Sequence, residues 1–218
     1  MSKTMTPRSN SATATPQTEV AKAKDPKSLL RLYRPDLAAI LEKRDVPSYR
    51  HAQVLEHLLR RSGAPLGEAS ALPTDLRSEL QPLGHSAISL LASTVARDGT
   101  AKFLLAARDG AEVETVLMPY HNRVTVCVSS QVGCPVGCLF CATGSLGFRR
   151  NLTVAEIVDQ VRLAAEMAGR QGKRVSNVVY MGMGEPLLNL GAVLESIAVL
   201  TYSRGLGLAH RALSVSTV

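Results

Sequence analysis

The four cysteines of this 218-residue chain all fall between Cys127 and Cys141. Three of them, Cys134, Cys138 and Cys141, form a C-x3-C-x2-C run on a glycine-bearing segment. Three thiols this close together cannot all be paired in disulfides, and no apolar secretory signal stands at the N-terminus. The run therefore predicts ligands to a metal centre.

The spacing of the ligands indicates which metal they suit. A structural zinc site takes four ligands, usually as two C-x2-C pairs or as cysteine and histidine pairs. Here the remaining cysteine, Cys127, lies seven residues upstream of the run in a predicted strand, and none of the five histidines has ligand spacing to it. A 4Fe-4S cluster normally takes four cysteines. A site that supplies three leaves one iron open to an exogenous ligand, where chemistry can occur.

The cysteine run, with the aromatic Phe140 directly before its third cysteine, resembles the radical S-adenosylmethionine (SAM) superfamily. The resemblance implies that Cys134, Cys138 and Cys141 bind a 4Fe-4S cluster and that SAM chelates the open iron. It further implies that an electron from the cluster breaks the sulfonium bond of SAM and releases a 5′-deoxyadenosyl radical. The expected cofactors are thus a 4Fe-4S cluster and SAM.

Four longer stretches carry a more specific resemblance: Cys127-Val-Ser-Ser-Gln-Val-Gly-Cys134, Cys141-Ala-Thr-Gly, Gly147-Phe-Arg-Arg-Asn-Leu-Thr153 and Met181-Gly-Met-Gly-Glu-Pro-Leu-Leu-Asn189. With them, the chain from about Val113 to the last residue resembles the RlmN/Cfr type of RNA adenine methyltransferase. This family implies methylation of carbon 2 of an adenine in 23S ribosomal RNA, and in transfer RNA, with electrons from a flavodoxin-type donor. It also implies a monomer in the cytoplasm.

The same resemblance assigns roles to residues outside the cysteine run. Gly184 and Glu185, after one predicted strand, and Ser216, at the end of the next, would contact SAM, and ligands of parallel α/β folds do bind at the carboxyl ends of strands. Cys127 would take a proton from the adenine and form a transient disulfide during product release, and Glu114 would be a proton acceptor. Residue type alone has a simpler explanation for each position. Gly184 and Glu185 suit an ordinary βα turn, Cys127 suits a buried apolar strand position, and Glu114 suits a solvated one.

The chain departs from the family pattern in its cysteine count. The family carries the transferred methyl group on a further cysteine in the C-terminal half of its domain, and this sequence has no fifth cysteine. The sequence also stops inside a predicted strand, which would leave a parallel sheet with an exposed edge. We therefore expect an N-terminal portion of such an enzyme, unable to methylate RNA as written.

The elements that position these residues predict the beginning of a parallel α/β sheet or barrel, and the resemblance implies that it is a truncated radical SAM barrel. Hydrophobic residues are 45% of the chain and charged residues 20%, enough for a core. We predict a disordered tail over 1–28, a helical accessory domain over 29–84, a small antiparallel β segment over 85–119, and a partial radical SAM core of three parallel strands over 120–218.

Periodicity and capping signals set the expected bounds. Pro35 and Ser48 mark the starts of two helices, the second of which stops at Gly63, and shorter segments follow at Gly67–Leu72 and Thr74–Leu80. Thr153 and Glu156 form a capping box for a helix that runs to about Gly169. The predicted strands are Ser89–Val95, Ala101–Ala106, Glu112–Met118, Arg123–Ser129, Ser176–Met181 and Ala212–Val218, with Asp109-Gly110 as a hairpin turn and a helix at Ala192–Tyr202.

The net charge of +7 permits a polyanionic partner such as RNA. The dense basic spots are the pairs Arg60-Arg61, Arg149-Arg150 and Lys173-Arg174, each of which is by itself typical of a solvated surface. No apolar run approaches the roughly 18 residues of a membrane helix. Two other functions stay open: a relative that methylates carbon 8 of adenine, and a non-catalytic zinc-binding RNA module that uses Cys127 with the cysteines of the run.

Overall fold

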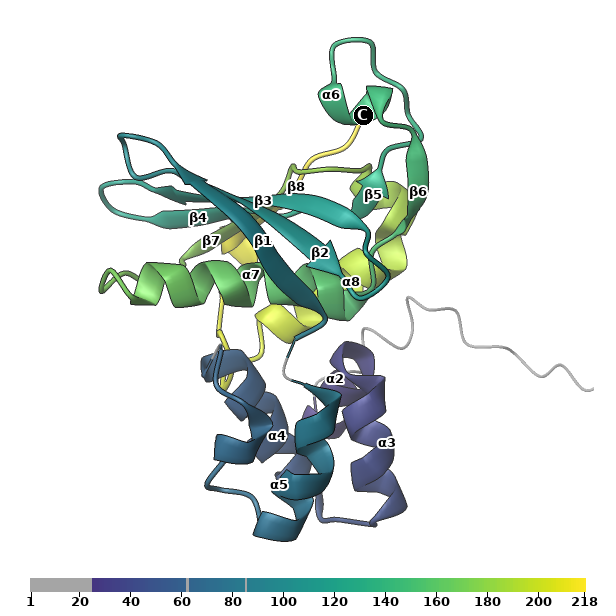
Figure 1. Ribbon diagram of the computed structural model, residues 1–218, viewed down its shortest axis with the longest axis vertical. Coiled ribbons are helices and arrows are strands. Elements are labelled where there is room, and N and C mark those ends of the chain that lie inside the picture. The colour runs from purple at the N-terminus through teal and green to yellow at the C-terminus, as the bar shows by residue number, and fades with distance from the viewer. Residues whose placement is uncertain (1–24, 62, 85) are drawn as a thin grey trace, which may run out of the picture.

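The computed structural model describes residues 25–61, 63–84 and 86–218, and its N-terminal part is a group of short helices at one end of the molecule (Figure 1). Within the described residues there is no helix long and apolar enough to cross a membrane. The helices are α2 (Pro26–Tyr33), α3 (Pro35–Lys43), α4 (Ser48–Arg60) and α5 (Thr74–Leu80), with single turns of 3-10 helix at Leu66–Glu68 and Gln81–Leu83.

The helices of this region begin and end at residues that differ in part from the predicted ones. The first helix begins inside the expected tail, because the Asp25 side chain accepts hydrogen bonds from the N–H groups of Lys27 and Ser28 at 3.0 and 3.1 Å. Residues 1–24 of that tail lie outside the described residues. Pro47, not Ser48, is the N-cap of α4, and the expected segment at Gly67–Leu72 is reduced to a turn.

The centre of the molecule is a single six-stranded sheet in the order β1-β2-β3-β4-β7-β8. The first four strands pair antiparallel in sequence, whereas β4 pairs parallel with β7 and β7 pairs parallel with β8. The antiparallel segment and the three parallel strands are therefore continuous. The strands are β1 (Ile88–Val95), β2 (Ala101–Ala107), β3 (Glu112–Pro119), β4 (Val124–Cys127), β7 (Asn177–Tyr180) and β8 (Leu213–Val215).

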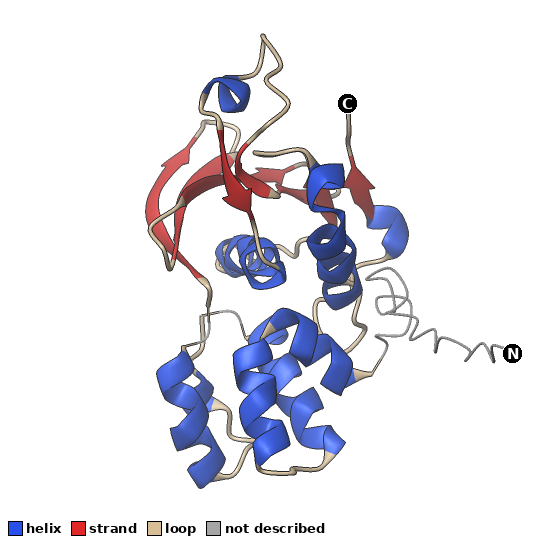
Figure 2. Cartoon of the chain, turned by 90° about the vertical axis from the view of Figure 1, so that its right-hand side faces the viewer, coloured by secondary structure: helices blue, strands red, loops and turns tan. Residues whose placement is uncertain are grey.

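Two helices cover one face of this sheet, and no other described helix packs across the opposite face, which we call the open face (Figure 2). The capping box of α7 (Val154–Gly169) is formed as predicted, with Thr153 and Glu156 bonded reciprocally. The second helix, α8 (Leu190–Leu200), packs beside α7. Thr115 of β3 donates a hydrogen bond of 2.7 Å to the Gln160 side chain of α7, which ties the covered face to its helix.

A second, two-stranded sheet was not predicted from the sequence. Its strands, β5 (Gln131–Gly133) and β6 (Phe148–Asn151), pair antiparallel on either side of the cysteine run. The short helix α6 (Ala142–Ser145) lies between them, and Figure 1 shows this segment projecting above the sheet, on the side away from the helical group. The cysteine run is therefore a loop held at its base by a β ladder.

A buried polar cluster joins the helical group to the sheet domain. The Tyr33 hydroxyl of α2 donates a hydrogen bond to the Asp159 carboxylate of α7, which also pairs with Arg162. The Arg162 guanidinium in turn donates to the carbonyl of Leu58 in α4, and the N–H of Ala87 donates to Asp159 at 2.6 Å. Breaking a fully buried ion pair costs about 3–5 kcal/mol, so this cluster fixes how the two parts sit together.

Candidate active site

The cysteine loop has a defined base and a less packed tip. The N–H of Cys134 donates to the carbonyl of Gly147 at 3.1 Å, and the N–H of Cys141 donates to the carbonyl of Cys138 at 3.0 Å. Gly133 sits at φ +73°, and a Cβ there would lie 1.7 Å from the Gly147 carbonyl oxygen. Only glycine allows the two strands to approach this closely ahead of the first cysteine.

The chemistry of the donors fits a cluster with an open iron. All four cysteines are free thiols and partly exposed. Cys141 is the N-cap of α6, and hydrogen bonds from the N–H groups of Gly144 and Thr143, with a further one from the Thr143 hydroxyl, lower the pKa of its thiol. Among the described residues, no group of three or more His, Cys, Asp or Glu side chains is arranged around a single metal ion. The donors on the loop are three free cysteine thiols, and thiolates of this kind are the ligands that hold iron–sulfur clusters.

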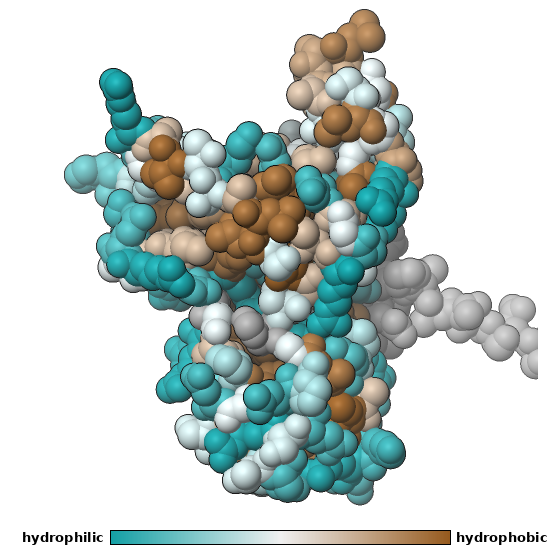
Figure 3. Space-filling model, in the orientation of Figure 1, coloured by the Kyte–Doolittle hydropathy of each residue, from teal (hydrophilic) through white to brown (hydrophobic). Residues whose placement is uncertain are grey.

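Exposed apolar side chains lie on the same projecting segment as the three thiols. Leu139 and Phe140 are almost fully exposed, at 104% and 92% of their reference areas. Exposed apolar groups gathered in one place mark a ligand or partner site more often than an ordinary surface. Figure 3 shows this apolar cap at the top of the molecule, and its large members are Val136, Leu139, Phe140, Leu146 and Phe148.

A second loop follows β7 and packs against the base of the cysteine loop. Gly184 sits at φ +98°, and a Cβ there would lie 2.5 Å from the Cβ of Gln131. Gly182 is equally close to its neighbours, since a Cβ there would lie 2.8 Å from the hydroxyl of Ser129. An ordinary βα turn does not require glycine at both positions, so the close approach itself selects these residues.

Glu185 joins this loop to the end of the third parallel strand. Its carboxylate accepts hydrogen bonds from the Leu187 N–H at 3.0 Å and from the Thr217 hydroxyl at 2.7 Å. Burial raises the pKa of Glu185, but these two bonds and one from the N–H of Val218 outweigh it, so the pKa lies below its ordinary value. Ser216 is exposed beside these contacts. The structure thus brings Glu185 and the segment that holds Ser216 together, as the sequence predicts for the carboxyl ends of parallel strands.

Gln131 connects the two loops and was missed as a site residue. Its side chain is buried, accepts a hydrogen bond from the N–H of Glu185 at 2.8 Å and donates one to the Asn151 side chain at 2.8 Å. Ser129 acts similarly nearby, because its hydroxyl donates to the carbonyl of Glu114 and accepts from the N–H of Met183. Both residues lie within the motif between Cys127 and Cys134, so the signal was present in the sequence.

Cys127 and Glu114 share the open face of the sheet. Cys127 pairs with Val116 of β3, two residues from Glu114, and both side chains are partly exposed. Burial raises the pKa of the Cys127 thiol, partly offset by a hydrogen bond from the N–H of Met181. The Glu114 carboxylate forms an ion pair of 2.9 Å with Lys102. A partly shielded thiol and a carboxylate therefore lie on neighbouring strands, below the two loops.

One of the expected basic surface pairs has a structural role. Arg150 of β6 forms bidentate ion pairs, with N–O distances of 2.8 to 2.9 Å, with two carboxylates. One belongs to Asp109 in the β2–β3 turn and the other to Glu156 in the capping box of α7. These bonds hold the pKa of Asp109 well below its usual range. Arg150 is thus not a solvated cation, and it ties the base of the cysteine loop to two other elements.

The chain is similar to known radical SAM proteins in sequence and in structure. Residues 128–214 match the Radical SAM superfamily. The chain is 43% identical to the probable dual-specificity RNA methyltransferase RlmN of Thermus thermophilus over 85% of this chain and 52% of that protein, and 49% identical to its Gloeobacter violaceus counterpart over 84% and 51%. A crystal structure of a radical SAM methyltransferase from Sphaerobacter thermophilus superposes with a TM-score of 0.78 at 40% identity, covering 82% of this chain and 53% of that one.

The fold and the cysteine loop define a radical SAM domain. Within that class, the chain is a homologue of the RlmN-type methyltransferases, which confirms the resemblance seen in its motifs. The expected cofactors, a 4Fe-4S cluster and SAM, agree with this membership. The chain spans about half the length of the curated relatives it matches. The expected α/β fold is confirmed, although the described strands form an open sheet and no closed barrel.

Proposed function

We propose that this chain binds a 4Fe-4S cluster through Cys134, Cys138 and Cys141 and SAM beside it. The observation that carries the proposal is Gln131, whose side chain bonds both to the strand that closes the cysteine loop and to the N–H of Glu185. Two loops joined by one buried side chain hold their ligands at a fixed separation. When bound, the cluster supplies the electron that cleaves SAM.

We propose further that the substrate of the whole enzyme is an adenine in RNA, methylated at carbon 2 in 23S ribosomal RNA and in transfer RNA. Support comes from the dual-specificity RNA methyltransferase relatives, at 43% and 49% identity, and from the basic net charge. Carbon 2 is electrophilic, so transfer of a methyl cation equivalent cannot modify it, and a radical route is required. We also propose a flavodoxin-type electron donor, a monomeric state and a cytoplasmic location.

The side chains of this chain would bind and position the reactants. Glu185, Gly184 and Ser216 lie where SAM would be held, and the apolar cap around the thiols would keep water away from the cluster. Cys127 and Glu114 face the open side of the sheet, where an adenine ring would have access to both. Cys127 is a free thiol in the structure, and the proposed transient disulfide would need a second cysteine, which these 218 residues do not supply once three cysteines hold the cluster.

Methyl transfer by these 218 residues is limited by their cysteines. Three are assigned to the cluster, Cys127 is assigned to product release, and the sequence contains no other. We therefore propose that the 218-residue protein cleaves SAM reductively but leaves RNA unmethylated. Incubation with reductant, radiolabelled SAM and ribosomal RNA fragments, followed by digestion of the RNA, tests this. Methyladenosine above the level of a cluster-free control would contradict it.

The proposed position of methylation has a separate test. Mass spectrometry of RNA modified by a full-length homologue that shares these motifs distinguishes 2-methyladenosine from 8-methyladenosine. The product expected is 2-methyladenosine, and the carbon-8 isomer would favour the alternative within the family. The zinc-module alternative is less consistent with the structure, since the Cys127 thiol accepts its hydrogen bond from Met181 at the sheet and lies outside the cysteine loop.

A further inference from the structure

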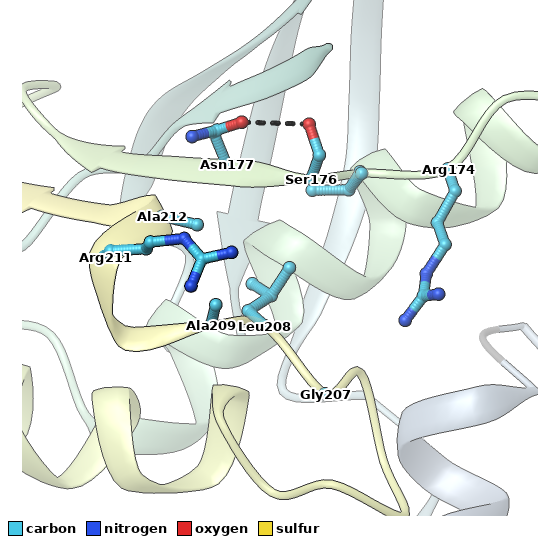
Figure 4. A pocket seen from close by; sticks show the side chains of 9 residues that line it. Arg174, Ser176, Asn177, Gly207, Leu208, Ala209, Arg211 and Ala212 are labelled. Atoms are coloured by element: carbon cyan, nitrogen blue, oxygen red, sulfur yellow. Dashed lines mark hydrogen bonds between the residues drawn. The ribbon is translucent and has the colours of Figure 1, made fainter.

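Two adjoining hollows lie beside the junction of the sheet domain and the helical group, away from the cysteine loop. The first, of about 470 Å³, is at the amino ends of β7 and β8, and Figure 4 shows its lining. The second, of about 380 Å³, lies between α4 and the end of α7. Arg174 lines both hollows, so they form one groove, which we call the junction groove. Its basic residues are Arg60, Arg61, Arg174 and Arg211.

The junction groove brings together charges that are far apart in the sequence. The pairs Arg60-Arg61 and Lys173-Arg174 are separated by more than a hundred residues, yet Arg60, Arg61 and Arg174 line the same hollow. Arg211 joins them from the turn before β8, and Figure 4 shows its guanidinium extending into the first hollow, with Arg174 at the far end. Folding thus brings the pair Arg60-Arg61 together with Arg174 and Arg211 along one groove.

These arginines are available to an outside anion. Among the described residues, none of the four forms an ion pair with an acidic side chain, and Arg174 donates a single hydrogen bond of 3.0 Å to the carbonyl of Leu206. The acidic group in the lining, Glu166, is already paired with Arg170 at 2.7 Å. The groove therefore has an excess of positive charge that the rest of the described protein does not neutralise.

The chemistry of the groove favours a polyphosphate chain over a membrane surface. Besides the arginines, the residues around it include Ser176 and Asn177, whose side chains are hydrogen-bonded to each other at 2.9 Å. None of the large apolar side chains that the described residues expose lies in either hollow, whereas a membrane-binding surface would place apolar groups beside its cations. Arginine guanidinium groups pair well with phosphate oxygens.

We propose that the junction groove binds backbone phosphates of the RNA substrate, at a distance from the base that reacts. The proposal rests on the proposed RNA methyltransferase function and adds a second contact surface to it. Glu185 and Ser216 follow the carboxyl ends of β7 and β8, whereas the groove lies at their amino ends. Phosphate contacts fix the register and orientation of a nucleic acid without reading its sequence. The groove would orient the RNA so that its target adenine meets the open face of the sheet.

The test is the salt dependence of RNA binding by the 218-residue protein. Fluorescence anisotropy measures the affinity for a fluorescein-labelled 20-nucleotide RNA hairpin over a series of salt concentrations. Removing one arginine–phosphate pair lowers the slope of log K against log salt by about 0.7 to 0.9. Arg61→Ala and Arg211→Ala should each show that reduction, and the double variant about twice as much. All the substituted side chains are exposed, so circular dichroism should show unchanged folding.

Two further variants separate a local effect from a general charge effect. Lys43→Ala removes one exposed positive charge from α3, outside the groove, and should leave the slope unchanged. Arg211→Lys keeps the charge and should retain the slope. The groove proposal alone would be overturned if the slope of the double variant equalled that of the wild type. It would also be overturned if Lys43→Ala lowered the slope as much as Arg61→Ala or Arg211→Ala does. A wild-type protein that does not bind the hairpin would instead contradict the RNA function on which it rests.

Discussion

Replacing Gln131 with methionine should weaken both candidate cofactor loops together. The substitution keeps the length of the side chain but removes the acceptor for the Glu185 N–H and the donor to Asn151. Glu185 is 7% exposed, so its N–H would be left in a nearly dry environment without a partner, which costs about 1–3 kcal/mol. Asn151 is exposed, and water can replace its hydrogen bond from Gln131. The unpaired Glu185 amide therefore dominates the cost.

The free-energy cost of the unpaired Glu185 N–H predicts the results of two assays. For a protein of this size, about 1–3 kcal/mol corresponds to a fall in Tm of about 2–12 °C. If SAM binding is weakened by the same free energy, the dissociation constant measured by calorimetry rises by about 5- to 150-fold. Iron content should be retained, because the three loop cysteines are unchanged. Gln171→Met, in the exposed turn after α7, is the matched control and should behave as the wild type. Wild-type values of Tm and SAM affinity in Gln131→Met would refute the proposed role of this side chain.

The remaining predictions concern the thiols, the SAM loop and the buried polar cluster. Alanine at any of the three loop cysteines should abolish the reconstituted cluster as measured by iron content, whereas Cys127→Ala should retain it. Gly184→Val should weaken SAM binding in calorimetry without loss of iron, because the new Cβ would enter the space of Gln131; unchanged affinity would mean that the loop is only a turn. Asp159→Ala should lower Tm by about 6–20 °C, since breaking the buried ion pair with Arg162 costs about 3–5 kcal/mol. Asp98→Ala, in the exposed β1–β2 turn, should change Tm little. With the loop cysteines replaced by serine, the rate at which iodoacetamide alkylates Cys127 should reach half its maximum at a pH above 9.0, the ordinary pKa of a thiol, because burial disfavours the thiolate. A half-maximal pH at or below 9.0 would contradict the shielding of this thiol.

Local signals explain why much of the fold was predictable. The capping box of α7 is formed by residues three positions apart, so the sequence contains both partners. The hairpin of β2 and β3 is likewise specified by alternation and by the Asp109-Gly110 turn. Elements of this kind lay within a few residues of their expected bounds. The largest discrepancy was the predicted strand at Ala212–Val218, which is paired only over Leu213–Val215.

Contacts between distant residues explain what the sequence did not reveal. The β5–β6 ladder joins segments on either side of a loop, and neither strand is long enough to show the alternation of apolar and polar residues that marks a strand. Arg150 was expected on the surface, because nothing local indicates that Asp109, forty-one residues away, reaches it. The candidate site residues were found through a family motif, whereas Gln131 required the fold to show that it contacts both loops.

The central claim is that three thiols, and no fourth, hold a cluster whose open iron meets SAM. The most direct measurement is electron paramagnetic resonance of the anaerobically reconstituted and reduced protein, recorded with and without SAM, for the wild type and for Cys127→Ala. We predict a 4Fe-4S signal in both proteins that changes shape when SAM is added. A signal that SAM does not alter, or a cluster that disappears in Cys127→Ala, would contradict it.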